Sequence, residues 1–385
     1  MAIQEIIKNK KYKIDVPIGY NGTKRIRHIE TFYGGKKEAI LRENEIKISK
    51  KNNTYINKTK LTFKDLIEKW LENQKNIWSP RTYRTNIGLS KTVIERIGHI
   101  HIQNINTEIL EDFYNTLRKE TKKDKYNNSV IKYSENTIQH FYTFINSVLN
   151  KAVIWNYILT NPNKKIEKPK FIKKDIACYS PEEVEMLVSV LNNEPLKYQA
   201  IIMLALDSGA RRGEITGLTW EDINLEEKTI FINKTTQYIK EIGIFEKTPK
   251  TQTSIRKIYI SDFTIEILKK YKKEQLLKKM KIGTQWGNSK RVFTTEFGND
   301  MHPDTPTKIL EKVINKYNLK KISFHGLRHT CISLQINSGI QVQIISKRAG
   351  HSNITVTHNT YSHFFENEFK EVANVMNNIL TVKAN

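Results

Sequence analysis

The sequence predicts a multi-domain protein that is mainly α-helical and carries small β-sheets. Three observations lead to this fold class. The chain has 385 residues, which suits two or three domains. Helical periodicity dominates its middle part, whereas strand-like alternation occurs only near the start and in the second half. With 38% hydrophobic residues, the chain can bury real cores.

Residues 1–56 are expected to form a small β-sheet with one helix. Residues 11–18 and 23–32 alternate polar and apolar side chains around a GYNG turn, which indicates a hairpin. A helix is expected over residues 36–48, and the polar stretch 50–60 has the composition of a linker. Residues 1–60 hold 15 Lys and Arg against six Asp and Glu, so this sheet is basic.

Residues 61–168 are expected to form an all-helical domain of four helices. Thr62 caps the first helix, and Ser79 followed by Pro80 starts the second, which Gly98 ends. Thr107 opens the third helix and Asn136 opens the fourth. The aromatic residues along these helices are interpreted as ordinary core. Asn-Pro and Lys-Pro pairs at 161–162 and 168–169 then mark a second linker.

Residues 175–385 are expected to form a larger domain of mixed α and β structure. Ser180 and Glu183 have the spacing of a capping box, and residues 199–207 form an apolar, buried helix. Strands are expected at 228–233 and 255–260, with a polar turn before the second. The remaining helices are expected near residues 306–317, 325–338, 342–347 and around Tyr361.

The net charge of +24 favours a polyanionic partner, and nucleic acid is the commonest one. An anionic membrane surface would also fit the charge, and a codon bias toward Lys, Asn and Ile would inflate it without any such role. No apolar stretch is long enough to span a bilayer, so we expect no membrane partner. Cys178 and Cys331 lie far apart, which excludes a disulfide framework and argues against zinc. Such cysteine usage fits a reducing, cytoplasmic location.

Polar side chains suited to phosphate chemistry occur in four segments of the last domain. In the first, Arg211 can bond two phosphate oxygens at once, and Glu214 is placed to orient it. In the second, Lys250 lies in a turn from which a flexible ammonium can protonate a leaving oxygen, and Lys247 competes for this role. Taken singly, each of these residues is more often an ordinary surface residue.

The third and fourth segments add imidazoles, a second guanidinium and a phenol. His325 and Arg328 are three residues apart and share one helix face. His329 is interpreted as a core or capping residue without a direct role. His351, in a Gly-His-Ser sequence, precedes Tyr361 by ten residues. A tyrosine alone at position 361 would be interpreted as a packing residue. The combination of two arginines, a lysine, two histidines and a tyrosine in these four segments is not typical of packing.

These segments resemble, in order and spacing, the tyrosine recombinase (phage integrase) family. The resemblance covers about the last 180 residues and implies a site built from six residues with one supporting carboxylate. Those residues are Arg211, Lys250, His325, Arg328, His351 and Tyr361, with Glu214 in support. Three departures from the family pattern touch no reacting group: Ala210, Gly326, and a Lys-bearing hairpin that is one residue longer than in many relatives.

The resemblance also implies roles for the three predicted domains. Residues 1–56 are similar to the arm-type DNA-binding domain of integrases from phages and conjugative transposons, 61–168 to the helical core-binding (SAM-like) domain, and 175–385 to the catalytic domain. The implied partner is double-stranded DNA with core-type and arm-type sites. A homotetramer on DNA is expected, with an excisionase or a host DNA-bending protein as accessory partner. Residues 366–385 are expected to form either a subunit-exchange helix or a helix that packs on its own domain.

The implied chemistry is strand cleavage through a 3′-phosphotyrosine, which conserves the bond energy for resealing. Arg211, Arg328 and a histidine stabilise the transition state, His325 helps to take the Tyr361 proton, and Lys250 protonates the 5′ oxygen. No ATP, metal or other cofactor is required. Two other classes of protein stay open on the sequence: a DNA-binding protein without enzymatic activity and a type IB topoisomerase. The intact residue set disfavours the first, and the separate basic N-terminal module disfavours the second.

Overall fold

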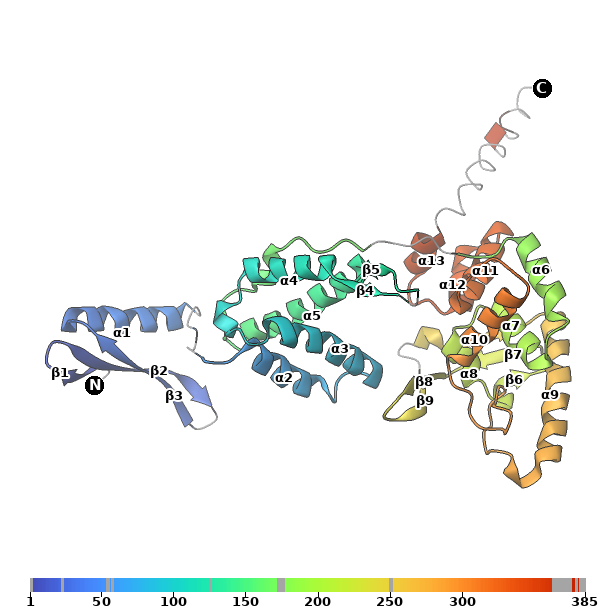
Figure 1. The fold of residues 1–385 in the computed structure, drawn as a ribbon, viewed down its shortest axis with the longest axis horizontal. Coiled ribbons are helices and arrows are strands. Elements are labelled where there is room, and N and C mark those ends of the chain that lie inside the picture. The colour runs from blue at the N-terminus through green and yellow to red at the C-terminus, as the bar shows by residue number, and fades with distance from the viewer. Residues whose placement is uncertain are drawn as a thin grey trace. The chain divides into compact units, whose positions relative to one another are not determined.

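A computed structural model describes residues 3–21, 24–52, 56, 59–124, 126–171, 177–248, 252–361, 376–377 and 380. The chain divides into two compact units, residues 1–173 and 174–385, and each is described by itself (Figure 1). The structure is mainly helical with small sheets, so the predicted fold class is confirmed. Among the residues that the structure describes, none of the helices has both the length and the apolar character needed to cross a membrane.

The first unit holds a three-stranded sheet with a helix, followed by a group of helices. Its elements, with 3-10 helices labelled η, are β1 (Ile3–Ile7), β2 (Lys11–Asn21), β3 (Lys24–Tyr33), α1 (Lys36–Lys51), α2 (Phe63–Gln74), α3 (Pro80–Ile97), η1 (Ile102–Asn104), α4 (Thr107–Lys119), β4 (Thr121–Lys123), β5 (Ser129–Ile131), α5 (Glu135–Ile154) and η2 (Pro162–Lys165).

The N-terminal sheet is antiparallel with the strand order β1-β2-β3, and α1 packs on it. Ile14 and Val16 of β2 are buried against Ile46 of α1, which gives this small sheet its core. The predicted hairpin and helix are confirmed, whereas β1 was not predicted. Because α1 continues to Lys51, the expected linker begins later than predicted, and residues 53–55 and 57–58 of it lie outside the described residues.

The helices α2 to α5 form a separate hydrophobic core. The side chains of Thr62 and Ser79 accept backbone N–H groups at the starts of α2 and α3, and Gly98 ends α3, as predicted. The fourth helix begins at Glu135 because Ser134, not Asn136, is its N-cap. The prediction of an all-helical region was incomplete, since β4 and β5 form a short antiparallel hairpin between α4 and α5.

The second unit is of mixed α and β structure. Its elements are α6 (Pro181–Leu191), α7 (Leu196–Ser208), α8 (Arg212–Gly217), η3 (Trp220–Asp222), β6 (Ile223–Asn224), β7 (Thr229–Ile232), β8 (Thr235–Ile239), β9 (Gly243–Lys247), η4 (Gln252–Ser254), β10 (Arg256–Tyr259), α9 (Asp262–Ile282), η5 (Gly283–Gln285), α10 (Thr305–Lys316), α11 (Phe324–Asn337), α12 (Val342–Ala349) and α13 (Ile354–Tyr361).

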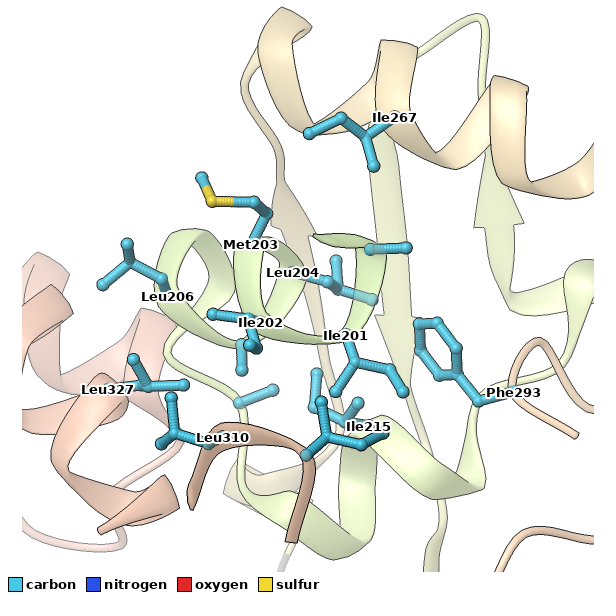
Figure 2. Packing of buried hydrophobic residues seen from close by; sticks show 14 of the residues in the cluster. Ile201, Ile202, Met203, Leu204, Leu206, Ile215, Ile267, Phe293, Leu310 and Leu327 are labelled. Atoms are coloured by element: carbon cyan, nitrogen blue, oxygen red, sulfur yellow. The ribbon is translucent and has the colours of Figure 1, made fainter. Parts of the chain in front are cut away.

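The buried helix α7 lies at the centre of this second unit. It contacts α6, α8, α9, α10 and α11. Figure 2 shows Ile201, Ile202 and Leu204 of α7 surrounded by apolar side chains, among them Leu310 of α10 and Leu327 of α11. Burying each such side chain contributes about 1.5–3 kcal/mol to the stability of the fold. The packing of α7 therefore holds in place the elements that start at its end.

Antiparallel strands precede and follow the basic turn that the sequence singled out, and residues 249–251 of that turn lie outside the described residues. A three-stranded sheet has the order β10-β7-β6, and a second hairpin, β8-β9, is inserted in the chain between β7 and β10. The capping box of α6 and the strands β7 and β10 are as predicted. The hairpin β8-β9 and the 21-residue helix α9 were not predicted.

Candidate active site

A turn at the end of α7 positions Arg211. Gly209 adopts a left-handed backbone conformation with φ of 61°, which ends α7 and lets the chain turn directly into α8. Arg211 is the N-cap residue of α8, and its Nη2 donates to the carbonyl of Gly350 at 3.1 Å. The Arg211 side chain is 40% exposed, so an external ligand can reach it.

The carboxylate of Glu214 joins two guanidiniums. It accepts the backbone N–H and the Nη1 of Arg211 at 2.8 and 2.9 Å, and the Nη1 and Nη2 of Arg256 at 3.2 and 2.8 Å. Burial acts to raise the pKa of Glu214, but the hydrogen bonds and charges of Arg256 and Arg211 hold that pKa below its usual range. Glu214 is therefore ionised at neutral pH and fixes both arginines.

Arg328 is almost fully buried in α11, with 2% of its surface exposed. Its Nη1 donates to the carbonyl of Gly209 at 2.7 Å. Its Nη2 is also buried, and it has no hydrogen-bond partner among the residues that the structure describes. Burial and the charge of Arg211 lower the pKa of Arg328 to about 10, so the guanidinium remains charged at neutral pH. A buried, charged donor without a partner is suited to an anionic ligand.

The rings of two histidines of α11 and of Tyr361 in α13 are neighbours. The rings of His325 and His329 are 4.6 Å apart with an edge-to-face angle of 84°. Nδ1 of His329 lies 2.5 Å from the hydroxyl oxygen of Tyr361, which is a hydrogen bond. The hydrogen bond to the phenol is thus made by His329, whereas the sequence had suggested His325 as the proton acceptor. Burial raises the pKa of Tyr361, and the charge of Arg328 opposes this rise.

His351 follows Gly350, which ends α12 in a left-handed conformation. Its Nδ1 is hydrogen-bonded to the hydroxyl of Thr357 in α13 at 2.7 Å. Burial, followed by the charges of Arg328, Arg211 and Arg256, lowers the pKa of His351 to about 4. At neutral pH this imidazole is therefore neutral, and it lies in the field of three guanidiniums.

The structure brings together most of the predicted site. The pKa values of His325, Arg328 and His351 all respond to the charge of Arg211, which places these groups in one electrostatic neighbourhood. Tyr361 joins it through Arg328 and His329. Lys250 lies outside the described residues, and its competitor Lys247 ends β9. The proposed subunit-exchange segment 366–385 also lies outside them, apart from residues 376, 377 and 380.

Two residues of this cluster, Arg256 and His329, were missed by reasoning from the sequence. Arg256 and Ile258 occupy the buried positions of β10, and a charged residue at an inward strand position needs a partner. That alternation was a usable signal. His329 lies four residues after His325 on the same helix face, and this spacing was the corresponding signal.

Comparisons with known proteins identify the family of this chain. The model of the phage integrase family matches residues 179–368, and the model of the N-terminal SAM-like domain of phage integrases matches residues 62–118. The integrase of Staphylococcus phage L54a is 30% identical over 352 residues, which cover 86% of this chain and 96% of that relative. The chain belongs to the phage integrase family. It is thus a tyrosine recombinase, an enzyme that cuts and rejoins DNA strands at specific sites.

Two further similarities extend over most of the recombinase. A XerC-like tyrosine recombinase of Caldanaerobacter subterraneus is 28% identical over 398 residues, covering 97% of this chain and 98% of that protein. The solved structure of the Tn1549 transposon integrase in complex with a circular intermediate DNA has a TM-score of 0.67 at 20% identity. The match covers 82% of this chain and 99% of that one.

Proposed function

We propose that Tyr361 is the nucleophile of this recombinase and that Arg211, Arg328, His325 and His351 bind the scissile phosphate. Glu214 positions Arg211 without touching the DNA. The observation that carries this proposal is the buried Nη2 of Arg328, which lacks a hydrogen-bond partner among the described residues, while the charge of Arg328 acts on the pKa of Tyr361. A phosphate oxygen supplies the acceptor that this charged donor needs.

The positive charge of the site suits the transition state of the reaction. A phosphodiester under attack gains negative charge on its equatorial oxygens, and fixed donors aimed at that charge lower the barrier. Glu214 pairs with Arg211 and Arg256, and its charge also acts on Arg328. Because one carboxylate faces three guanidiniums, the cluster keeps an excess of positive charge. A dianionic transition state would neutralise this excess better than the singly charged ground state.

The proposed reaction conserves the energy of the DNA backbone. The Tyr361 oxygen forms a bond to phosphorus, and the bond to the 5′ oxygen breaks, which leaves a 3′-phosphotyrosine. Lys250 is proposed to protonate the departing 5′ oxygen. A 5′ hydroxyl from another strand then attacks the ester and reseals the backbone. Through this exchange the enzyme would integrate or excise a mobile element such as a prophage or a transposon.

A nicked duplex from which the cleaved end diffuses away traps the covalent intermediate and tests the nucleophile. We expect Tyr361→Phe to bind the duplex normally but to give no protein–DNA adduct, because the attacking oxygen is gone. Tyr259→Phe, which alters an exposed tyrosine of β10, is the matched control and should form the adduct at the normal rate. An adduct that persists in Tyr361→Phe would show that another residue is the nucleophile.

The same trapped substrate tests the two arginines. Arg211→Ala and Arg328→Ala should each lower the rate of adduct formation by about 10²–10³-fold, because each removes a donor to the developing charge. Their affinity for the duplex should fall far less. Arg212→Ala is the control, since Arg212 pairs with Asp304 outside the site. Equal losses of binding and cleavage would instead indicate a structural role.

We further propose roles for the parts of the chain that contact DNA away from the cleavage site. Residues 1–56 would bind arm-type sites, 61–168 would bind the core site, and 175–385 would carry out catalysis. The basic N-terminal sheet, with 15 Lys and Arg in residues 1–60, supports the first assignment. Removing residues 1–56 should abolish protection of arm-type sites in footprinting while cleavage of a core-site suicide duplex continues. If the shortened protein instead lost core-site cleavage and still protected arm-type sites, these assignments would be contradicted.

The assembly is proposed to be a homotetramer on two duplexes, because exchanging both strands of two sites requires four nucleophiles. An excisionase or a host DNA-bending protein would set the direction of the reaction, which would take place in the cytoplasm of a bacterial host. Mass measurement of complexes with a two-site substrate should give four subunits for each pair of sites. A stable dimer that recombines both sites would overturn this stoichiometry.

A further inference from the structure

One face of α11 presents His325, Arg328 and His329, which lie at relative positions i, i+3 and i+4. The proposed function uses the first two of these residues and leaves His329 without a role. Yet Nδ1 of His329 is hydrogen-bonded to the phenol of Tyr361. This contact joins a basic nitrogen to the oxygen that is proposed to attack DNA.

The position of the phenol is fixed by packing as well as by this hydrogen bond. Tyr361 is only 1% exposed, and its ring belongs to a small apolar cluster. That cluster consists of Ile332, Ile336, Ile345 and Ala349 together with Tyr361. The aromatic rings of His329 and Tyr361 have their centroids 5.6 Å apart. Because the ring is held on its apolar sides, the hydroxyl has a defined direction toward Nδ1.

The protonation states set the direction of the hydrogen bond. Burial, with the nearby His325 and Arg328, lowers the pKa of His329 to about 4, so the imidazole is neutral at neutral pH. Burial raises the pKa of Tyr361, so the phenol keeps its proton. The phenol therefore donates and Nδ1 accepts, which places the imidazole hydrogen on Nε2.

We propose that His329 is a catalytic residue whose Nδ1 takes the proton of Tyr361 as the phenol oxygen attacks the phosphate. The O–H bond of Tyr361 breaks and its proton passes to Nδ1, while the bond between the phenol oxygen and phosphorus forms. The bond from phosphorus to the 5′ oxygen breaks, and Lys250, the acid of the proposed function, protonates that oxygen. During resealing, the 5′ hydroxyl gives its proton back to Lys250 as its oxygen bonds to phosphorus, the bond from phosphorus to the phenol oxygen breaks, and His329 returns its proton to that oxygen.

Binding of DNA makes this imidazole a better base. The charge of Arg328 is one of the causes that disfavour a protonated His329. A phosphate held by Arg328 offsets that charge, so the imidazolium becomes easier to form when the substrate is in place. Proton transfer is thus coupled to occupation of the phosphate site.

The inference rests on Tyr361 being the nucleophile, and its test separates the two ideas. His329→Asn keeps an amide that can accept the phenol hydrogen bond but cannot take its proton, whereas His329→Ala removes both functions. We expect both variants to bind duplex normally and to form the trapped adduct about 10²–10⁴-fold more slowly than the unaltered protein. His302→Ala, which alters a histidine whose ring contacts Tyr238 at a centroid distance of 4.3 Å, is the control and should cleave normally.

Two further measurements separate proton transfer from positioning. Imidazole added to His329→Ala should restore adduct formation by at least about tenfold, since a small base can occupy the space of the lost ring. A substrate whose 5′-bridging oxygen is replaced by sulfur has a leaving group that needs no proton. On it Lys250→Ala should recover, while both His329 variants should remain slow.

Normal cleavage by His329→Asn would overturn the inference, because a residue that cannot accept a proton would then suffice. Failure of imidazole to restore His329→Ala would also overturn it, as would recovery of the His329 variants on the sulfur substrate. An adduct in Tyr361→Phe would refute the proposed function instead. If Tyr361→Phe is inactive and the His329 variants cleave normally, the nucleophile stands and His329 is not its base.

Discussion

Glu214 is a single carboxylate on which two guanidiniums depend. Arg256, which is itself buried, approaches it with two nitrogens, and Arg211 approaches with a third and with its backbone N–H. Removing one partner of a buried ion pair leaves the other charge uncompensated, which is far costlier than losing an exposed pair. The residue therefore serves stability and also the orientation of a phosphate-binding arginine.

We predict that Glu214→Gln lowers the free energy of unfolding at neutral pH by about 3–5 kcal/mol. It should also slow cleavage of the trapped substrate, because Arg211 loses its anchor. The folded protein holds the pKa of Glu214 below the unfolded value. Its stabilisation is hence complete above the unfolded pKa and is lost as the pH falls through the folded pKa.

Denaturant unfolding of both proteins as a function of pH checks this prediction. The stability difference between the unaltered protein and Glu214→Gln should shrink in acid. Glu266→Gln, which breaks an exposed pair with Lys269, is the control and should cost at most about 1 kcal/mol. A difference that stays constant down to strongly acidic pH would contradict the assignment of the stabilising charge to Glu214.

Site residues could be predicted where they lie close together in the sequence at a characteristic spacing. Residues that meet only through folding could not be predicted. His325 and Arg328 lie one helical turn apart, and Arg211 and Glu214 have the spacing of a helix start, so short segments were enough to find them. Arg256 reaches Glu214 across 42 positions of the chain, and His329 meets Tyr361 across 32. Such contacts exist only after folding, and a single sequence carries no spacing rule for them.

At the scale of elements, the end of α12 connects two halves of the site. Gly350 has φ of 70° and gives its carbonyl to Arg211, and His351 follows it directly. A Cβ atom at this position would lie 2.8 Å from Nη1 of Arg256. The glycine is thus required both by its left-handed conformation and by the close approach of that guanidinium.

We predict that Gly350→Ala lowers stability by more than the strain of a left-handed alanine, which is about 1–2 kcal/mol. It should also slow cleavage, because the Arg256–Glu214–Arg211 contacts must shift. Gly339→Ala is a matched control, since Gly339 has φ of 72° but no atom within 4 Å of a Cβ placed there. This control should show the strain alone. Equal cleavage by the two variants would mean that the contact with Arg256 does not matter.

Helices and strands could be predicted when their hydrophobic periodicity was clear or when a capping residue marked their start. The caps at Thr62, Ser79 and Ser180 located three helix starts correctly. The helix α9 escaped because only its first half is buried, while Leu276, Leu277 and Met280 of its second half are exposed and blur the apolar stripe. The strands β4 and β5 have three residues each, too few for alternation to be recognised.

At the scale of the whole molecule, charge governs the encounter with DNA. The net charge of +24 is spread over a chain whose catalytic cluster is itself positive. Each DNA phosphate that a protein neutralises releases counterions, so added salt weakens binding. Buried contacts within the cluster are screened much less than exposed ones. Binding and cleavage should therefore respond differently to ionic strength.

We predict that the affinity for a core-site duplex falls by about 10³–10⁵-fold between 50 and 200 mM salt, as for six to ten phosphate contacts. The rate of adduct formation at saturating protein should change by less than about tenfold over the same range. Binding titrations and single-turnover cleavage measured in parallel check both statements. If the cleavage rate at saturating protein falls with added salt as steeply as the affinity does, the cluster is screened like an exposed surface.

The seclusion of the Tyr361 ring has a consequence for the protein before it meets its target. A phenol with 1% of its surface exposed cannot be reached by a phosphate that merely collides with the molecule. Nucleotides, RNA ends and unrelated chromosomal sequences would thus pass without being captured, and only a duplex bound firmly enough to displace the covering atoms would be attacked. Protection of unrelated DNA from cleavage would then be a property of the enzyme before it binds its target.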